Sequence, residues 1–397
     1  MRLVHLSDLH LGHRQYLRLT PAGINQREAD VARTFQRAVD RIVELKPGLI
    51  LVAGDVFHTA RPSNAAILHA FRQFLRLRTE LPQAPIVLVA GNHDTPRTTE
   101  TGSILGLFEQ LGVHVAASEA RRFSLLDGAV SVLAVPDVPG ARPELTPEKA
   151  KHNILVMHAD VEDVVPRHLA EIDRAAVRLT RAELGVSKWS YIALGHYHVH
   201  RRVADNAYYS GSIDYTSLNV WGDKADEEEF GLRGKGFVEY DLETRAVKFH
   251  DLDASRAFIR LKDISARNKS VAEIDAEVRK AVEKCKGGID DKVVRIVLRD
   301  VPRHIARELD HKALREFKKR ALHFQLDVRR EENAIRTGQG GPGRRLSVAD
   351  VVRENLTTRE MPADLSRDRL VEMGLKYLAD AEALTVADAA LPVTADD

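Results

Sequence analysis

The sequence predicts an α/β protein in which two layers of strands with flanking helices are followed by a small α+β unit and two C-terminal helices. Three observations lead to this prediction. Short runs of branched apolar residues alternate with amphipathic helical stretches through Asp253, a shorter series of strands and helices follows, and glycine-rich sequence then precedes two last helical stretches. At 397 residues with 44% hydrophobic content, the chain is long enough for two or three folded units.

Five of the predicted strands end in residues that bind metal ions in proteins. The strands read LVHLS, LILVA, IVLVA, NILVM and YIALG, and their length and branched side chains suit buried strands better than helices. They lead into Asp8-Leu9-His10, Gly54-Asp55, Gly91-Asn92-His93-Asp94, His158, and Gly195-His196-Tyr197-His198. If these strands share one sheet, the residues past their ends converge on one rim, where open α/β sheets bind ligands. The sequence therefore predicts a metal centre.

The residue types indicate which metal chemistry to expect. Imidazole binds transition metals and carboxylate or amide oxygen suits harder ions, so nitrogen and oxygen donors without thiolate indicate two ions of the manganese or iron type. Asp8 and His10 lie two residues apart, as do His196 and His198, and in extended backbone each pair points to one side. Two ions about 3.5 to 4 Å apart polarise a phosphate and lower the pKa of a bound water. Metal-assisted hydrolysis of a phosphoester fits this set.

The ordered series Asp-x-His, Gly-Asp, Gly-Asn-His-Asp, His and Gly-His-x-His resembles that of the calcineurin-like metallophosphoesterases. Three features narrow the resemblance to the SbcD nucleases, called meiotic-recombination-eleven nucleases in eukaryotes: DLHLG near the start, GDVFH with the additional His58, and YYSGS after His198. The resemblance is strongest over residues 1–211. It implies a two-layered β-sandwich metallophosphoesterase core flanked by helices, a small capping domain that helps to hold DNA, and a nuclease that acts in double-strand-break repair.

The resemblance also implies a role for each site residue. It assigns two Mn²⁺ ions, one to Asp8, His10, Asp55 and His198 and the other to Asp55, Asn92, His158 and His196, with Asp55 as the bridge. His93 would stabilise the phosphorane or protonate the leaving oxygen. Asp94 would orient His93 from behind, and His58 would contact the scissile phosphate.

Composition and pattern predict the domain boundaries. They divide the chain into residues 1–254, 255–333, a flexible glycine-rich linker at 334–346, a helix-loop-helix at 347–385 and a frayed tail at 386–397. The resemblance implies that the first of these is the nuclease domain and the second the capping domain. Residues 255–345 hold 24 Lys and Arg against 14 Asp and Glu, a net charge of +10, whereas residues 346–397 carry −6. A basic middle segment suits a polyanion.

Partners and location follow in the same way. The resemblance implies an SMC-like ATPase of the SbcC type that binds residues 347–385, and a homodimer formed by two helices near the active site. The stretches that match those helices carry Ile67 and Leu68, then Leu105 and Phe108. No apolar run has the length of a membrane span and the N-terminus lacks a signal peptide's apolar core, so the sequence predicts an intracellular protein without a membrane segment. The single cysteine, Cys285, fits a reducing compartment.

Several other polar residues are weaker candidates. His5 and His200 are predicted to pack or face solvent, and His13 either faces DNA or lies in a solvated loop. The acidic run at residues 226–229 is predicted to be a solvated loop, because it lacks the spaced ligands of a calcium loop.

Two further functions stay open. One is a small-molecule or cyclic-nucleotide phosphodiesterase, or a protein phosphatase, of the same superfamily, which shares the metal ligands but has no need of a basic cap or a helical tail. The other is a non-catalytic scaffold that tethers DNA ends and carries a vestigial metal site. The intact ligand series and His93 argue against the scaffold.

Overall fold

The computed structural model describes residues 1–96, 102–139, 143–162, 164, 175–302, 305–330, 348–358 and 366–388. The chain divides into two compact units, residues 1–330 and 331–397. The predicted nuclease domain and residues 255–330 of the predicted capping domain lie within the first unit. The whole predicted linker, 334–346, and the end of the predicted tail lie outside the described residues.

The first sheet has six strands in the order β14-β13-β1-β2-β3-β4. Strands β1 to β4 run parallel, and β13 and β14 extend the sheet beyond β1 as antiparallel strands. The bounds are β1 Arg2–Leu6, β2 Leu49–Ala53, β3 Ile86–Val89, β4 His114–Ala116, β13 Gly236–Asp241 and β14 Val247–Asp251.

The second sheet also has six strands, in the order β11-β12-β10-β7-β6-β5. Its four inner strands are parallel, and the edge strands β5 and β11 are antiparallel to their neighbours. The bounds are β5 Arg121–Leu125, β6 Val130–Val135, β7 His152–His158, β10 Tyr191–Gly195, β11 Arg201–Ala204 and β12 Ala207–Tyr209. A separate short pair consists of β8 Asp160–Val161 and β9 Arg178–Leu179.

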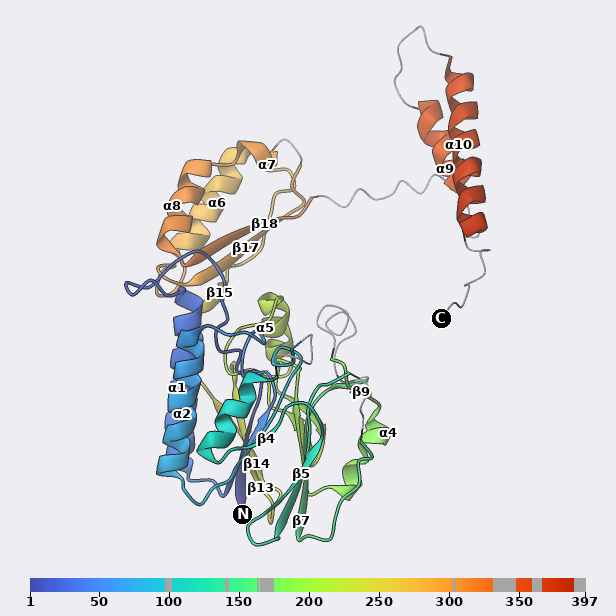
Figure 1. Ribbon diagram of the computed structural model, residues 1–397. Helices are drawn as coiled ribbons and strands as arrows, with labels where there is room; N and C mark the ends of the chain where they lie inside the picture. Colours follow the sequence, from blue (N-terminus) through green and yellow to red (C-terminus); the bar gives the residue numbers. More distant parts are fainter. Residues whose placement is uncertain are drawn as a thin grey trace. The chain divides into compact units, whose positions relative to one another are not determined.

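The two sheets pack face to face, and helices cover their outer faces (Figure 1). Strand β2 shows why the sequence folds in this way. Leu49 and Leu51 lie in the core between the sheets, whereas Ile50 and Val52 point the other way, into the core beneath the helices. A strand covered on both faces reads as a continuous apolar run. The predicted two-layered core flanked by helices is confirmed.

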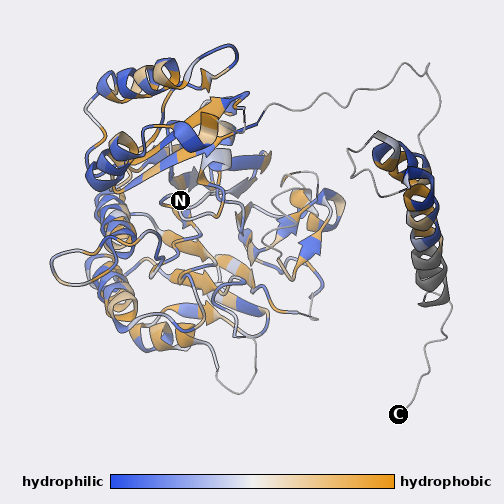
Figure 2. Cartoon of the chain, turned by 90° about the horizontal axis from the view of Figure 1, so that it is seen from above, coloured by the Kyte–Doolittle hydropathy of each residue, from blue (hydrophilic) through white to orange (hydrophobic). Residues whose placement is uncertain are grey.

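The helices of this part are α1 Gln26–Leu45, α2 Asn64–Glu80, α4 Arg181–Leu184 and α5 Val220–Glu229, with 3-10 turns η2 Ile104–Leu111 and η3 Val186–Lys188. Helix α1 begins at its cap Asn25, whose side chain accepts from the first free backbone N–H groups. Its predicted apolar face is fully buried, as shown by Val31, Phe35, Ala38, Val39 and Ile42. Figure 2 shows mostly hydrophobic strands inside and helices of mixed hydropathy outside them.

Residues 258–328 form a small α+β unit, as the sequence predicts. Central strand β17 pairs with β18 along one edge and with β15 and β16 on the other, all in parallel. The bounds are β15 Phe258–Arg260, β16 Ile264–Ser265, α6 Val271–Glu283, β17 Val293–Arg299, α7 Ile305–Glu308, α8 His311–Arg320 and β18 His323–Val328. Helices α6 and α8 pack on the sheet face that carries Val294 and Ile296.

The second unit contains α9 Val348–Thr358 and α10 Arg367–Asp388. The two helices pack on each other at Gly374, where an added Cβ would lie 2.5 Å from the Leu356 side chain. None of the described helices combines the length and apolar character that a membrane crossing requires.

Candidate metal centre

The five strands that carry the predicted ligands belong to two sheets. β1, β2 and β3 lie in the first sheet and β7 and β10 in the second, so the premise of a single sheet is wrong. The ligands converge nevertheless, because parallel strands of both layers end at the same end of the sandwich. The two sheets approach each other closely at Gly195, where an added Cβ would lie 1.8 Å from the carbonyl oxygen of Ala53 in the facing sheet.

The backbone turns sharply after β1, β2 and β10. Asp8, His10 and Asp55 have φ values of 52°, 45° and 50°, and His196 has 107°. Residues other than glycine rarely adopt positive φ, and such strained conformations cluster at functional sites. Backbone hydrogen bonds hold two of these turns together, since the N–H of Asp8 donates to Gly54 at 3.0 Å and that of His10 to Asp55 at 2.9 Å.

A first group of donor atoms comes from Asp8, His10 and His198. Their ligand atoms all lie within 4.8 Å of one another. The Nε2 atoms of His10 and His198 face each other at 3.0 Å, and the Nε2 of His198 lies 3.9 Å from Oδ1 of Asp8. All three residues are buried.

A second group lies beside the first and shares Asp55 with it. Oδ2 of Asp55 is 3.6 Å from Nε2 of His10 and 3.5 Å from Nε2 of His158, so this carboxylate stands between the two groups. The Nε2 of His158 also lies 3.0 Å from Oδ1 of Asn92. The ring of His196 packs edge-on to that of His158, with centroids 5.3 Å apart. The structure therefore brings all seven predicted ligands to one place.

These donors fit divalent cations. Donor atoms on an ion with bonds of about 2.1 Å lie roughly 3 Å apart when they are neighbours in its coordination shell. The separations of 3.0 Å between His10 and His198, and between His158 and Asn92, match that spacing. The Nδ1 of His158 lies 2.9 Å from the carbonyl of Ala53, which assigns the proton to Nδ1 and leaves the Nε2 lone pair for a metal.

The electrostatics favour cation binding. Burial raises the pKa of Asp8 to about 7, with the neighbouring Asp55 carboxylate adding to the increase against the effect of His158. Burial, together with the surrounding histidines, holds the pKa of His10 well below its usual range, so this imidazole is neutral. Buried carboxylates are costly unless they are paired, and neutral imidazoles are the form that binds metal.

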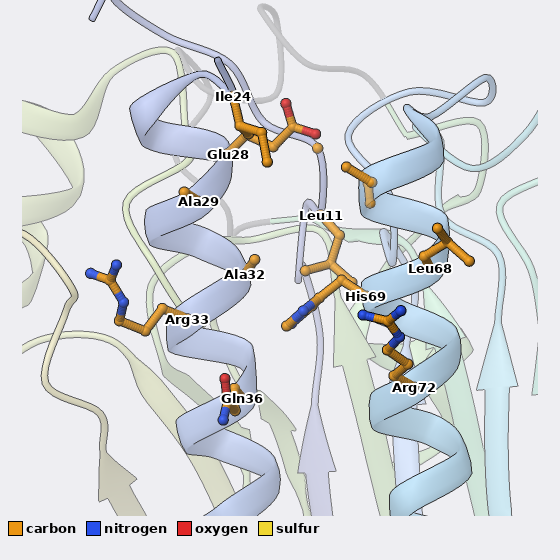
Figure 3. A pocket seen from close by; sticks show the side chains of 13 residues that line it. Leu11, Ile24, Glu28, Ala29, Ala32, Arg33, Gln36, Leu68, His69 and Arg72 are labelled. Carbon is orange, nitrogen blue, oxygen red and sulfur yellow. The ribbon is translucent and has the colours of Figure 1, made fainter. Parts of the chain in front are cut away.

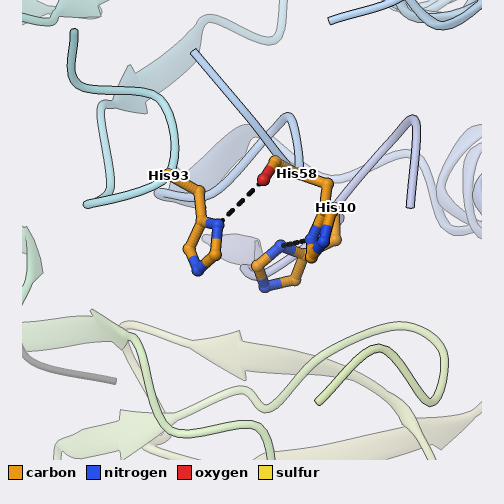
Figure 4. A group of neighbouring side chains, drawn as sticks. All are labelled: His10, His58 and His93. Atoms are coloured by element: carbon orange, nitrogen blue, oxygen red, sulfur yellow. Dashed lines mark hydrogen bonds between the residues drawn. The ribbon is translucent and has the colours of Figure 1, made fainter. Parts of the chain in front are cut away.

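Two further histidines, His58 and His93, lie beside the ligand His10 (Figure 4). The ring of His93 stacks on that of His58 with centroids 5.2 Å apart, and Nδ1 of His58 is 3.3 Å from Nδ1 of His10. The Nδ1 of His93 is 2.8 Å from the carbonyl of His58 and donates to it, which fixes the orientation of the His93 ring.

Asp94 has a different task from the one predicted. Its two carboxylate oxygens accept hydrogen bonds from the backbone N–H groups of Val56 at 3.0 Å, Phe57 at 2.8 Å and Gly91 at 3.2 Å. The prediction that it orients the His93 ring is therefore corrected: Asp94 joins the two ligand loops that carry Asp55 and Asn92. The sequence placed Asp94 next to His93, but this proximity along the chain did not reveal the direction of the side chain.

Residues of the YYSGS motif, among them the serine that ends it, form hydrogen bonds with three of the segments that carry ligands. Tyr209 accepts from the N–H of Val161 and donates to the carbonyl of Ala159, each at 2.9 Å, and so fixes the chain after His158. The hydroxyl of Ser210 lies 2.8 Å from that of Ser7, which in turn donates to Asp8. Ser212 donates its backbone N–H to the carbonyl of His198 at 3.0 Å.

The glycines that precede the ligands leave the space that the site needs. An added Cβ at Gly54 would lie 2.3 Å from Nδ1 of His158, and one at Gly91 would lie 2.0 Å from Oδ1 of Asp55. Real Cβ atoms do not approach other atoms so closely, so a side chain at either position would displace a ligand.

We expect Gly91→Ala to lower phosphodiesterase activity by about 100-fold, because a ligand displaced by about 1 Å costs that order of rate. Initial rates with manganese measure the loss. Gly106→Ala is the matched control, since nothing lies within 4 Å of an added Cβ there. Equal activity of the Gly91 and Gly106 variants would contradict the tight fit around Asp55.

The weaker histidine candidates divide into two groups. His5 lies in the core between the sheets with Nδ1 3.0 Å from the Tyr191 hydroxyl, and His200 stacks on Phe249 with centroids 4.4 Å apart, so both are packing residues as predicted. His13 is buried, and its ring meets that of His58 at 4.7 Å. Sequence reasoning underestimated His13, because only the fold shows that its loop turns back toward the site.

Comparison with known proteins agrees with this geometry. The profile of the family described as calcineurin-like phosphoesterase matches residues 1–224. The chain belongs to this family. Membership makes the chain a metal-dependent phosphoesterase, and every ligand described above lies within the matched residues.

The chain is also similar to archaeal proteins named DNA double-strand break repair protein Mre11. The one from Methanococcus maripaludis is 24% identical over 316 residues, which cover 72% of this chain and 77% of the relative. The one from Methanocaldococcus jannaschii is 26% identical over 305 residues, or 69% and 73% of the two chains. The one from Methanopyrus kandleri is 25% identical over 412 residues, or 95% and 82%.

Proposed function

We propose that this protein is a nuclease of DNA double-strand-break repair that hydrolyses DNA phosphodiesters with two Mn²⁺ ions, as exonuclease and endonuclease. The observation that carries the proposal is the position of Asp55, whose carboxylate stands between two groups of nitrogen and oxygen donors. The names of the archaeal relatives support DNA as the substrate.

The geometry supports the following proposed roles for the chain's own residues. Two bound ions would polarise the phosphate, activate a water and neutralise charge on the leaving oxygen. Asp8, His10 and His198 would hold one ion and Asn92, His158 and His196 the other, with Asp55 shared. In its protonated form, His93 would keep the Nδ1 proton on the carbonyl of His58 and give its Nε2 proton to the leaving oxygen. His58 would contact the scissile phosphate.

The small α+β unit would help to hold DNA beside this site. It packs on the loop that follows His10: Tyr16 stacks on His323 with centroids 4.2 Å apart, and Arg18 donates to the carbonyl oxygens of Lys319 at 2.7 Å and Ala321 at 2.9 Å. Residues 255–330 hold 21 Lys and Arg against 12 Asp and Glu, and this net charge of +9 favours a polyanion next to the metal centre.

A hydrolysis panel with manganese separates the candidate functions. The substrates are an end-labelled DNA duplex, an aryl phosphodiester and a cyclic nucleotide. We expect cleavage of DNA and of the aryl ester, with little hydrolysis of the cyclic nucleotide. Preference for the cyclic nucleotide would favour a small-molecule phosphodiesterase, and DNA binding without hydrolysis of any substrate would favour a scaffold.

The helix pair of the second unit would bind the coiled coil of an SMC-like ATPase. Among the side chains of α9 and α10 that the structure describes, four large apolar ones are exposed, namely Val348, Val351, Met373 and Tyr377. Exposed apolar surface on a helix pair suits a partner helix that lays its own apolar face on it. The residues from 331 onward form a compact unit separate from residues 1–330.

We expect truncation after Arg345 to abolish co-purification with the ATPase while cleavage of small substrates stays unchanged. The reason is that the helix pair forms its own unit, so its removal leaves the core of the first unit intact. Pull-down and thermal melting measure the two effects. A melting temperature lowered by several degrees together with unchanged ATPase binding would contradict the proposal, since about 2 to 4 °C corresponds to each kcal/mol lost. Met373→Lys in the full-length chain tests the same prediction with a single substitution at one of the exposed apolar side chains.

We further propose that the chain forms a homodimer through the exposed side of α2. The predicted contact residues need correction, because Leu105 and Phe108 are fully buried in the core. Leu68 and Leu75 lie seven residues apart on α2 and are 54% and 45% exposed. Leu68 also borders a cavity of about 430 Å³ between α1 and α2 (Figure 3). An exposed apolar stripe of this kind suits a second copy of the same helix.

The double variant Leu68→Asp, Leu75→Asp should be a folded monomer in light scattering at concentrations where the unchanged chain is a dimer. Both side chains already face solvent, so the substitutions leave the core intact. Leu105→Asp serves as the contrast, because a charge in the core should unfold the chain. A double variant that remains dimeric would reject this surface as the interface.

A further inference from the structure

Helix α5 differs from the sequence prediction in a way that concerns the metal centre. The acidic run at residues 226–229 is not a solvated loop but the C-terminal part of this helix. Asp223 and Glu227, one turn apart on α5, are 1% and 3% exposed. Buried carboxylates need a partner, and the partner here is a buried lysine.

Lys235 lies between α5 and the loop that carries His198. Its ammonium nitrogen is 2.8 Å from Oδ2 of Asp223 and 3.0 Å from Oε1 of Glu227. The same nitrogen donates to the backbone carbonyl of His198 at 2.8 Å. The side chain of Lys235 is only 1% exposed, so these contacts are shielded from water.

The lysine keeps its charge in this place. Burial alone lowers the pKa of Lys235, but the carboxylates of Asp223 and Glu227 outweigh that effect and raise it. A hydrogen bond from a charged donor is roughly twice as strong as one between neutral groups. The carbonyl of His198 is therefore held more firmly than by the Ser212 N–H alone.

A second contact from α5 reaches the residue before His198. The hydroxyl of Tyr197 donates to Oδ2 of Asp226 at 2.7 Å. Helix α5 thus holds the Tyr197 side chain directly and the carbonyl of His198 through Lys235. This segment needs such support, since His196 has a φ of 107° and its backbone N–H also faces the Asp8 carboxylate at 3.1 Å.

We propose that Lys235 is a positioning residue of the metal centre, which fixes the carbonyl of His198 and so directs the His198 imidazole at a divalent cation. Asp223 and Glu227 keep the ammonium in place, and Tyr197 with Asp226 supports the same segment. This inference rests on the two-ion site of the proposed function. Residues that orient a metal ligand in this way typically change metal affinity by about 10- to 100-fold when they are removed.

The test measures the affinity for Mn²⁺ by calorimetric titration of the full chain. Lys235→Met alone leaves two buried carboxylates unpaired, so the main variant combines it with Asp223→Asn and Glu227→Gln. We expect this triple variant to bind one of the two ions about 10- to 100-fold more weakly than the unchanged chain. Tyr197→Phe is a second variant that removes a single hydroxyl, and it should weaken the same ion even if the triple variant does not fold.

A double-mutant cycle with His198→Ala shows whether Lys235 acts through His198. His198→Ala should remove the ion that the triple variant weakens, and adding the Lys235 changes in that background should leave the affinity of the remaining ion unchanged. Glu239→Gln, which alters a pair with His250 between β13 and β14, is the control for general destabilisation.

Unchanged manganese affinity in the folded triple variant would overturn the inference. So would a loss of manganese affinity that is equal whether the triple change is made in the unchanged chain or in the His198→Ala background. Where the triple variant does not fold, unchanged affinity in Tyr197→Phe would overturn it. The proposed function fails separately, if the unchanged chain binds two ions but does not cleave DNA. In that outcome the calorimetric titrations alone decide whether Lys235 has its proposed role in metal binding.

Discussion

The Asp55→Asn variant is expected to lose all measurable nuclease activity and to bind less manganese, while its fold is retained. The physical reason is that Asp55 Oδ2 lies 3.6 Å and 3.5 Å from the imidazole nitrogens of His10 and His158, so one carboxylate serves both donor groups. An amide is neutral, and it removes the negative charge that two cations share. Replacement of a ligand that contacts only one ion would weaken the binding of that ion alone.

Cleavage assays, bound-metal analysis and thermal melting measure these three properties of the Asp55 variant. Glu239→Gln is a suitable control, because it also neutralises a carboxylate, one that pairs with His250 at 2.7 Å between β13 and β14. Turnover near that of the unchanged chain, with metal still bound, would show that Asp55 is not the bridge.

His93→Ala should still bind two manganese ions and DNA, but cut DNA about 100- to 10,000-fold more slowly. The ring of His93 lies against those of His58 and His10, with centroids 5.2 Å and 4.9 Å away, and its Nδ1 donates to the carbonyl of His58. Removal of this side chain therefore takes away the proposed proton donor and leaves both groups of metal ligands in place.

Single-turnover cleavage separates this chemical effect from DNA binding. His114→Ala is the matched control, because His114 is a half-buried histidine of β4 in the first sheet and packs on Phe123 of β5 in the second. If a crystal structure of the His93 variant showed that one ion was lost, His93 would be a ligand instead.

The sequence predicted the strands well because their local pattern is strong. The runs LILVA and YIALG are covered on both faces in the structure, as continuous apolar runs should be. It did not predict that β1, β2 and β3 belong to one sheet and β7 and β10 to the other. That assignment depends on which strands pair, and pairing involves residues far apart in the chain.

The same limit applies to the candidate site. The residue types of the ligands were predictable, since Asp, Asn and His at strand ends have few other uses together. The directions of their side chains were not, because they depend on contacts such as that of His158 with the carbonyl of Ala53, 105 residues away. Asp94 and the acidic helix α5 were misjudged for this reason: their partners are backbone groups and Lys235, which no local pattern reveals.

Anomalous diffraction at the manganese edge, from crystals soaked with Mn²⁺, tests the central claim most directly. We expect two peaks about 3.5 to 4 Å apart on either side of the Asp55 carboxylate, one beside His10 and His198 and the other beside His158 and Asn92. A single peak, or peaks away from Asp55, in a chain that cleaves DNA would contradict a two-ion centre bridged by this residue.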